Sequence, residues 1–75
     1  MENKKELTLG QKRVGWNFNP TEDPQVRSYK KLFSEHIDRL ELQREGASSE
    51  KMRTISRAQT LAEDACMLSV KSIFQ

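Results

Sequence analysis

The chain has 75 residues and a mass of 8.7 kDa, with 35% hydrophobic residues, 32% charged residues and a formal net charge of +2. A monomer of this length buries only about 60% of its unfolded surface, which leaves little core to stabilise it. One cysteine and one histidine exclude an intrachain disulfide and a Cys/His zinc site. Self-association is therefore the first expectation.

Charge and hydropathy restrict the classes of partner. No apolar run reaches the roughly 18 residues of a membrane span, and residues 1–10 lack the apolar stretch of a signal peptide. We therefore expect a soluble, cytosolic protein without a membrane partner. Residues 1–31 carry a net charge of +3 and residues 32–75 a net charge of −1. A basic front half favours a phosphate-bearing ligand over duplex DNA, which needs a basic stripe along the whole domain, although an ordinary solvated surface has the same pattern.

Residues 1–22 are predicted to form an N-terminal arm. Alternating apolar and polar residues at 14–19 favour an extended backbone, while Gly10, Gly15 and Pro20 argue against a long strand. We expect an extended segment that lies over a neighbouring surface.

A first helix is predicted over residues 23–45. Asp23 is the expected N-cap, with Pro24 at the first helical position, where a missing N–H costs nothing. Apolar residues then recur at spacings of three and four, which forms one buried stripe. The stripe consists of Val26, Tyr29, Phe33, Ile37 and Leu40. Gly46 is the expected left-handed residue that ends this helix.

A second helix is predicted over residues 49–74, with Ser49 as its cap. The short connection at 46–48 places the two helices antiparallel. Small and apolar residues fill one broad face of the second helix, and Leu61, Leu68 and Phe74 point elsewhere. Apolar groups on more than one face require more than one neighbour. The predicted fold is all-α: residues 23–75 form an antiparallel two-helix hairpin, which carries the extended arm and assembles into a homo-oligomeric helical bundle.

Catalysis has little support in the sequence. His36 has no partner nucleophile at a recognisable spacing, and Cys66 reads as a small core side chain. Glu63 and Asp64 form an acidic pair without the further ligands of a metal site. No glycine-rich phosphate-binding loop is present. We therefore predict a protein that is not an enzyme and that uses no metal or cofactor.

Ligand binding has better support. Aromatic residues interleaved with basic and amide side chains are suited to nucleobase stacking and phosphate contact, and the arm has this pattern. The alternative is that its aromatic residues only fasten the arm to the hairpin. Lys30 on the first helix can reach a phosphate, and two arginines and a threonine share a face of the second helix. The candidate binding residues are Trp16, Phe18, Asn19, Lys30, Arg53, Arg57 and Thr60.

At this point the chain resembles a known family, the phage-encoded anti-CBASS sponges, which are related to the Thoeris anti-defence sponges. The main match is R-x4-A-x-T-x2-E-x-A-x-M-x2-V-K, which begins at Arg53. The first helix adds Val26, Lys30 and a later Ile-Asp pair, and residues 18–20 match a recurrent F-N-P in the arm. The match covers about residues 12–74.

The resemblance implies a compact homohexamer that binds cyclic oligonucleotides in pockets between protomers without degrading them. The ligands implied are cyclic GMP-AMP-like dinucleotides and, for some members, cyclic tri-adenylate-like trinucleotides. Trp16 matches the arm aromatic that stacks on a base, in place of a tyrosine, and Lys30 matches the lysine on the phosphates. Thr60 matches the trinucleotide site, and Arg57 is displaced by one position from its arginine. Sequestration in the cytoplasm of the infected bacterial host would keep CBASS effectors inactive.

Two other functions remain open at this stage. A small helical protein of this kind can inhibit or bridge another protein through its apolar faces. A single-strand nucleic-acid binder would instead show a steep dependence on salt. A phosphodiesterase stands last because the sequence offers no set of metal ligands.

Overall fold

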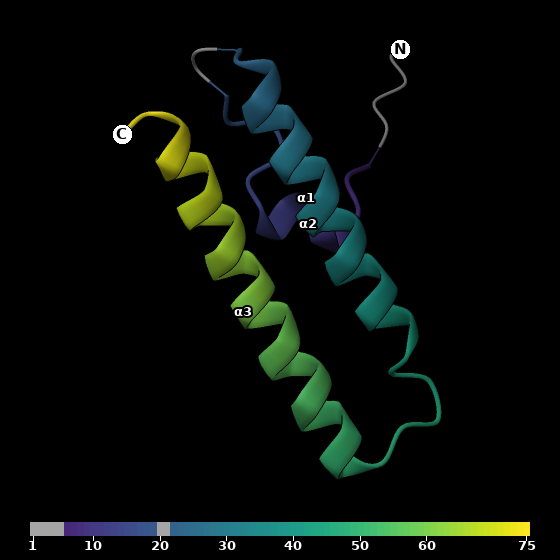
Figure 1. The fold of residues 1–75 in the computed structure, drawn as a ribbon. Helices are drawn as coiled ribbons and strands as arrows, with labels where there is room; N and C mark the ends of the chain where they lie inside the picture. The colour runs from purple at the N-terminus through teal and green to yellow at the C-terminus, as the bar shows by residue number, and fades with distance from the viewer. Residues whose placement is uncertain (1–5, 20–21) are drawn as a thin grey trace.

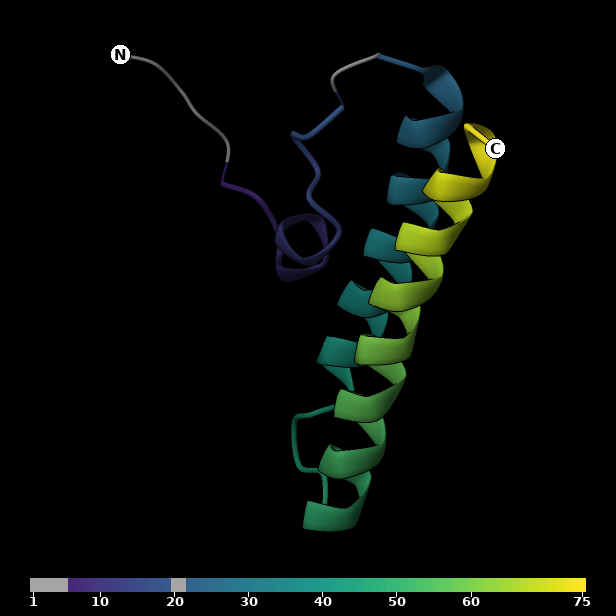
Figure 2. The same ribbon diagram turned by 90° about the vertical axis from the view of Figure 1, so that its left-hand side faces the viewer.

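The computed structural model describes residues 6–19 and 22–75, and these contain three helices, α1 (Leu9–Arg13), α2 (Pro24–Leu42) and α3 (Ser49–Ile73). Figures 1 and 2 show α2 and α3 side by side, running in opposite directions and joined at one end, with α1 on one side of the pair. No strand occurs among the described residues, so the predicted all-α class is confirmed. The prediction of an arm over 1–22 includes residues 1–5 and 20–21, which lie outside the described part.

The start of α2 is as predicted, and its end is not. The Asp23 carboxylate accepts a hydrogen bond from the Gln25 N–H at 2.8 Å, and Pro24 occupies the first turn. The helix ends at Leu42 instead of residue 45, and residues 43–46 form a turn. Gly46 has the expected left-handed φ of 71°, but in this turn instead of at the helix end. The earlier end allows the side chain of Arg44 to leave the line of α2 and reach α3.

The cap of α3 lies one residue earlier than predicted. The Ser48 hydroxyl, not that of Ser49, accepts a hydrogen bond from the Lys51 N–H at 3.1 Å. The core lies between α2 and α3, and its small size agrees with the estimate from chain length. Its buried apolar side chains are Val26, Ile37, Ile55, Ala62 and Cys66.

The prediction of an extended arm is wrong over residues 9–13, which form α1. Thr8 and Gln11 make a reciprocal capping box: the Thr8 hydroxyl accepts from the Gln11 N–H at 3.1 Å, and the Thr8 N–H donates to the Gln11 side chain at 2.9 Å. A helix of five residues is too short to be stable alone. Contacts with the rest of the chain must therefore hold it in place.

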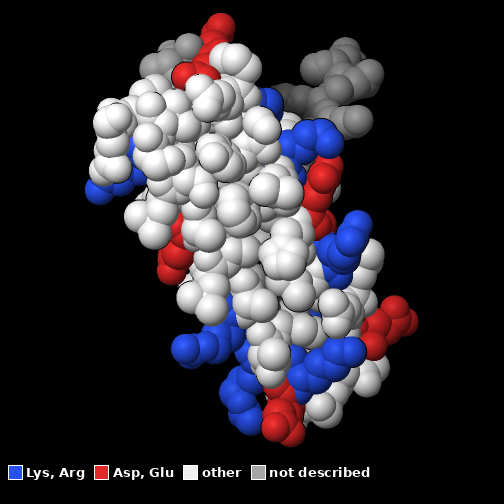
Figure 3. All heavy atoms as spheres, viewed as in Figure 1, with Lys and Arg blue, Asp and Glu red and all other residues white. Residues whose placement is uncertain are grey.

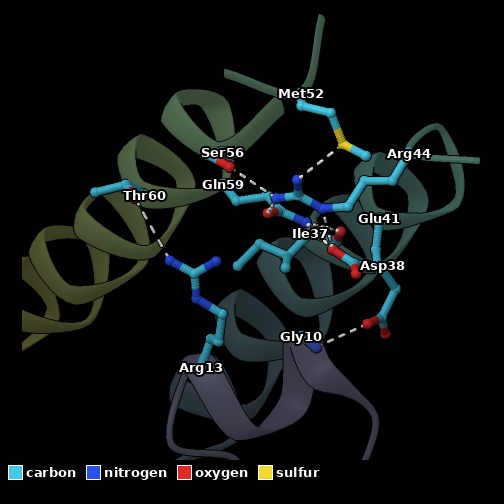
Figure 4. A network of polar contacts seen from close by, with 10 residues as sticks. All are labelled: Gly10, Arg13, Ile37, Asp38, Glu41, Arg44, Met52, Ser56, Gln59 and Thr60. Carbon is cyan, nitrogen blue, oxygen red and sulfur yellow. Dashed lines mark hydrogen bonds and ion pairs between the residues drawn. The ribbon is translucent and has the colours of Figure 1, made fainter. Parts of the chain in front are cut away.

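Gly10 provides the closest of these contacts. Its N–H donates to the Asp38 carboxylate on α2 at 2.7 Å, and Figure 4 shows this bond. A Cβ atom at this position would lie 2.1 Å from the Ser34 carbonyl oxygen, far inside a van der Waals contact. Only glycine lets α1 approach α2 this closely.

A polar cluster fixes α3 against the end of α2. The Arg44 guanidinium donates to the side chains of Glu41, Ser56 and Gln59, at 2.9, 2.9 and 2.8 Å. Gln59 is 1% exposed and also donates to the Ile37 carbonyl at 3.1 Å and to Glu41 at 2.9 Å (Figure 4). Because a buried amide must keep its hydrogen bonds, this cluster sets the register between the two helices.

The α2–α3 pair forms one layer, and α1 lies against one face of it (Figure 2). Because α1 is only five residues long, it covers little of α3. Large apolar side chains consequently remain exposed along α3, and Figure 3 shows a face of the molecule that is mostly free of charge toward the end of this helix. These residues are Leu61, Met67, Leu68 and Phe74. Within the described part of the chain, no helix is long and apolar enough to cross a membrane.

Replacing Gly10 with alanine should separate α1 from α2, because the new methyl group would overlap the backbone of Ser34. We expect amide exchange at Lys12 and Val14 to rise about tenfold or more, as overpacking of about 1–3 kcal/mol implies. Gly46→Ala is the control: that site is open but has a φ of 71°, so the substitution should lower global stability and leave α1 docked. Unchanged exchange in Gly10→Ala would refute the close approach.

The stability of the fold should also depend on the ionisation of Glu41. Hydrogen bonds from Gln59 and then Arg44 lower the pKa of Glu41 below its usual 4.5. A lowered pKa in the folded state adds stability above pH 4.5, and this contribution is lost as the pH falls through the folded value.

We therefore expect Glu41→Gln to destabilise the protein near neutral pH and the difference from the parent chain to shrink below pH 4.5. Urea unfolding midpoints between neutrality and strong acid measure this. Glu45→Gln is the matched control, because Glu45 is exposed and makes none of these contacts. A constant difference across the range would contradict the assignment.

Candidate functional site

A cavity of about 560 Å³ opens between the arm and the ends of α2 and α3. Gly15, Phe18 and Asn19 form the arm side of its wall, with Lys30 on α2 and mainly apolar residues on α3. The apolar part of the wall includes Val26, Cys66, Met67, Val70 and Phe74. The structure thus brings three of the seven predicted binding residues, Phe18, Asn19 and Lys30, to one cavity.

Lys30 is buried at the base of this cavity and is only 5% exposed. Its ammonium group donates to the backbone carbonyls of Gly15, at 2.6 Å, and of Phe18. It also lies 5.7 Å from the centre of the Phe18 ring. Burial, and then the nearby charge of Arg27, lower the pKa of Lys30 from its usual 10.5. The Lys30 ammonium therefore fastens the arm to α2 through these two carbonyls.

Trp16 stacks on an arginine that the sequence analysis did not select. The Arg27 guanidinium carbon lies 4.1 Å from the centre of the Trp16 ring, which is a cation–π contact. The Nη1 atom of Arg27 is buried and has no hydrogen-bond partner among the described residues. One face of the Trp16 ring contacts Arg27, and Trp16 is not among the residues that line the cavity.

Arg13 connects the arm to α3. Its guanidinium pairs with Glu63 at 2.8 Å and donates weakly to the Thr60 hydroxyl at 3.5 Å. Figure 4 shows Arg13 and Thr60 facing each other across the space between α1 and α3. Thr60, another predicted binding residue, therefore lies beside the arm, and Glu63 has a fold-stabilising partner instead of belonging to an acidic metal site.

Arg53 and Arg57 lie in a different place from the cavity. With Glu50 and Thr54 they line an open groove of about 470 Å³ near the start of α3. This groove and the cavity of Lys30 have no lining residue in common. Both arginines are exposed, which is compatible with an anion site and equally with a solvated helix edge. The seven predicted residues are therefore divided among the cavity, the groove and positions that line neither.

The residues considered for catalysis do not come together. His36 is exposed on α2, whereas Cys66 is 2% exposed on α3. Burial raises the pKa of the Cys66 thiol, and the nearby Lys30 charge opposes this only in part. A buried thiol with a raised pKa is a poor nucleophile. Across residues 6–19 and 22–75, no cluster of His, Cys, Asp or Glu is suited to hold a metal ion.

The burial of Lys30 and the role of Arg27 were not predicted from the sequence, although a signal for the first exists. Val26, Lys30, Ser34 and Ile37 are the buried residues of α2, at spacings of four, four and three. This spacing places Lys30 on the apolar stripe, while its neighbour Lys31 points to solvent and pairs with Glu35. The contact of Arg27 depends on the path of the arm, which no local pattern specifies.

Comparisons with protein-family models, curated proteins and solved structures give no match for this chain. The resemblance to the anti-CBASS sponges therefore stays a prediction from the sequence motifs.

Proposed function

We propose that this protein binds and sequesters cyclic oligonucleotide second messengers without cleaving them, as a phage anti-defence sponge. The observation that supports this most is the cavity of about 560 Å³, whose wall combines Phe18, Asn19 and Lys30. Its volume is within the range of about 300–1,000 Å³ that is usual for small-molecule sites. An aromatic ring, an amide and a cation are the groups that a base and a phosphate need.

The chemistry of the cavity suits a ligand with flat bases and negative charge. Phe18 is 74% exposed, so a face of its ring is open to a base. The Lys30 ammonium lies in the same wall and supplies positive charge, whereas Arg13, also in the wall, is paired with Glu63. Binding without catalysis is also consistent with the positions of Cys66, which is buried, and His36, which is exposed on another helix. These two side chains do not form an acid–base pair.

The proposed active form is a homo-oligomer, with a hexamer as the expected size. In it, each antiparallel hairpin would bury the apolar side chains that one chain leaves exposed, above all Leu61, Leu68 and Phe74. Because Phe74 also lines the cavity, a neighbouring protomer that covers it would enclose the ligand. Enclosure of most of the ligand surface is what tight binding requires.

The groove with Arg53 and Arg57 is the proposed location for a cyclic trinucleotide. Two guanidinium groups on one helix edge can bind phosphate oxygens in pairs. Thr60 follows on the same helix and has only a weak contact with Arg13.

The cytoplasm of an infected bacterium is the proposed location of the protein, since host effectors would meet the same messengers there.

A second candidate function is the inhibition or bridging of another protein. The exposed apolar side chains on α3, Leu61, Met67, Leu68 and Phe74, favour it, because exposed apolar surface is what a protein partner would cover. This candidate predicts that substitution of these side chains, and not of Phe18 or Lys30, abolishes activity.

Calorimetric titration with a panel of cyclic di- and trinucleotides tests the proposed function. We expect at least one cyclic dinucleotide to bind, and Phe18→Ala and Lys30→Ala to weaken binding about tenfold or more, because each removes a stacking or charged group of the cavity wall. Lys31→Ala is the matched control: it removes the same charge from an exposed position and should have little effect.

Two further measurements distinguish the alternatives. Nucleotide released by denaturation should be intact, and a cleaved product would favour an enzyme. Light scattering should give one discrete oligomer. If no member of the panel binds, the protein-inhibitor function is favoured. If a dinucleotide binds equally well to both variants, the assigned site is wrong.

A further inference from the structure

Residues 14–19, here called the strap, cross over the cation at the base of the cavity. The Lys30 ammonium donates to the strap carbonyls of Gly15 and Phe18, and the side chain is 5% exposed. The strap also forms part of the cavity wall through Gly15, Phe18 and Asn19. The same contacts therefore shape the cavity and occupy the group that a phosphate would need.

A second cation lies under the strap. Arg27 is one helical turn before Lys30 on α2, and the strap residue Trp16 covers its guanidinium at 4.1 Å. Its Nη1 atom is buried and has no hydrogen-bond partner within residues 6–19 and 22–75. After burial, the Arg27 charge is the second cause that lowers the pKa of Lys30.

Within residues 6–19 and 22–75, no carboxylate pairs with either cation, and the ion pairs use Arg13, Lys31 and Arg44 instead. Carbonyl dipoles satisfy Lys30, and an aromatic face covers Arg27, but both are weaker partners for a buried cation than an anionic oxygen. An orphaned guanidinium nitrogen beside an uncompensated ammonium favours the entry of an anion.

We propose that Lys30 and Arg27 form a latent phosphate site that the strap keeps closed in the free protein. A phosphate or phosphodiester oxygen replaces the two strap carbonyls as acceptor for Lys30 and accepts a hydrogen bond from Nη1 of Arg27. The strap lifts as the anion enters. The site itself is argued from this geometry, and only the identity of the phosphate carrier, a cyclic oligonucleotide, rests on the proposed function.

Ligand binding at the latent site should loosen the strap, which is the opposite of what a preformed pocket predicts. A ligand that binds a preformed pocket rigidifies the segments around it. Here the anion competes with the strap, so binding must release the strap amides. The reporting amides are those of Trp16 and Phe18, whose N–H groups donate to Gln11 and Gly15 carbonyls, both at 2.9 Å.

The first experiment uses hydrogen exchange on the ligand-free chain. Lys30→Met should raise exchange at Trp16 and Phe18 about tenfold or more, because the strap loses a charged hydrogen-bond donor. The amides of α3 report whether the variant stays folded, and they should be unchanged. Lys31→Met is the matched control and should leave the strap protected. Unchanged strap exchange in Lys30→Met would overturn the closure by Lys30.

The second experiment adds inorganic pyrophosphate and, separately, the cyclic dinucleotides. The proposal expects either ligand to raise exchange at Trp16 and Phe18, and Arg27→Gln to weaken its binding about tenfold, the effect of losing one charged hydrogen bond. Arg39→Gln, which changes an exposed arginine of α2 that lines neither the cavity nor the groove, is the control with the same change of charge.

The outcomes separate this inference from the proposed function. Pyrophosphate that releases the strap while no cyclic nucleotide binds supports the latent site and refutes the sponge function. A cyclic nucleotide that binds while the strap becomes more protected supports the sponge function and refutes the latent site. Binding of neither ligand refutes both.

Discussion

Two helices packed side by side bury only the sides that face each other, and this constraint governs the rest of the molecule. The short α1 covers part of one face of the pair and leaves most of the surface of α3 open (Figure 2). The apolar core is accordingly confined to a few side chains such as Ile37 and Cys66. Large apolar residues remain at the surface of α3, and polar contacts position the elements relative to one another.

The polar contacts divide into two groups with different tasks. Around Arg44 and Gln59 they join α3 to the end of α2 and fix the register of the pair. Around Lys30 and Gly10 they attach the arm to the side of α2. The first group is satisfied within the chain. The second group leaves Nη1 of Arg27 without a hydrogen-bond partner among the described residues, so the contacts of the arm are less complete than those between α2 and α3.

The sequence predicted the helices well and the arm poorly. Asp23 and Pro24 marked the start of α2 because a cap and a fixed φ act locally. The end of α2 was predicted three residues too late, at residue 45, because Arg44 instead lies in a turn and donates to Gln59 on α3, which is distant in the sequence. α1 was missed although Thr8 and Gln11 form a capping box, since the weak alternation of apolar residues in the arm favoured an extended backbone. Of the predicted binding residues, Phe18, Asn19 and Lys30 line one cavity, and Arg53 and Arg57 line a separate groove, a division that the sequence pattern did not indicate.

The sequence by itself determined the two long helices and the start of α2, because periodicity and caps depend on residues within a few positions of one another. Only the tertiary structure decided what Lys30 contacts. Spacing places this lysine on the buried stripe of α2, but its partners are carbonyls 12 and 15 residues earlier. Those carbonyls reach it because Gly10 permits α1 to approach the backbone of Ser34. Such a contact depends on the close packing of two elements, and no local pattern in the chain encodes it.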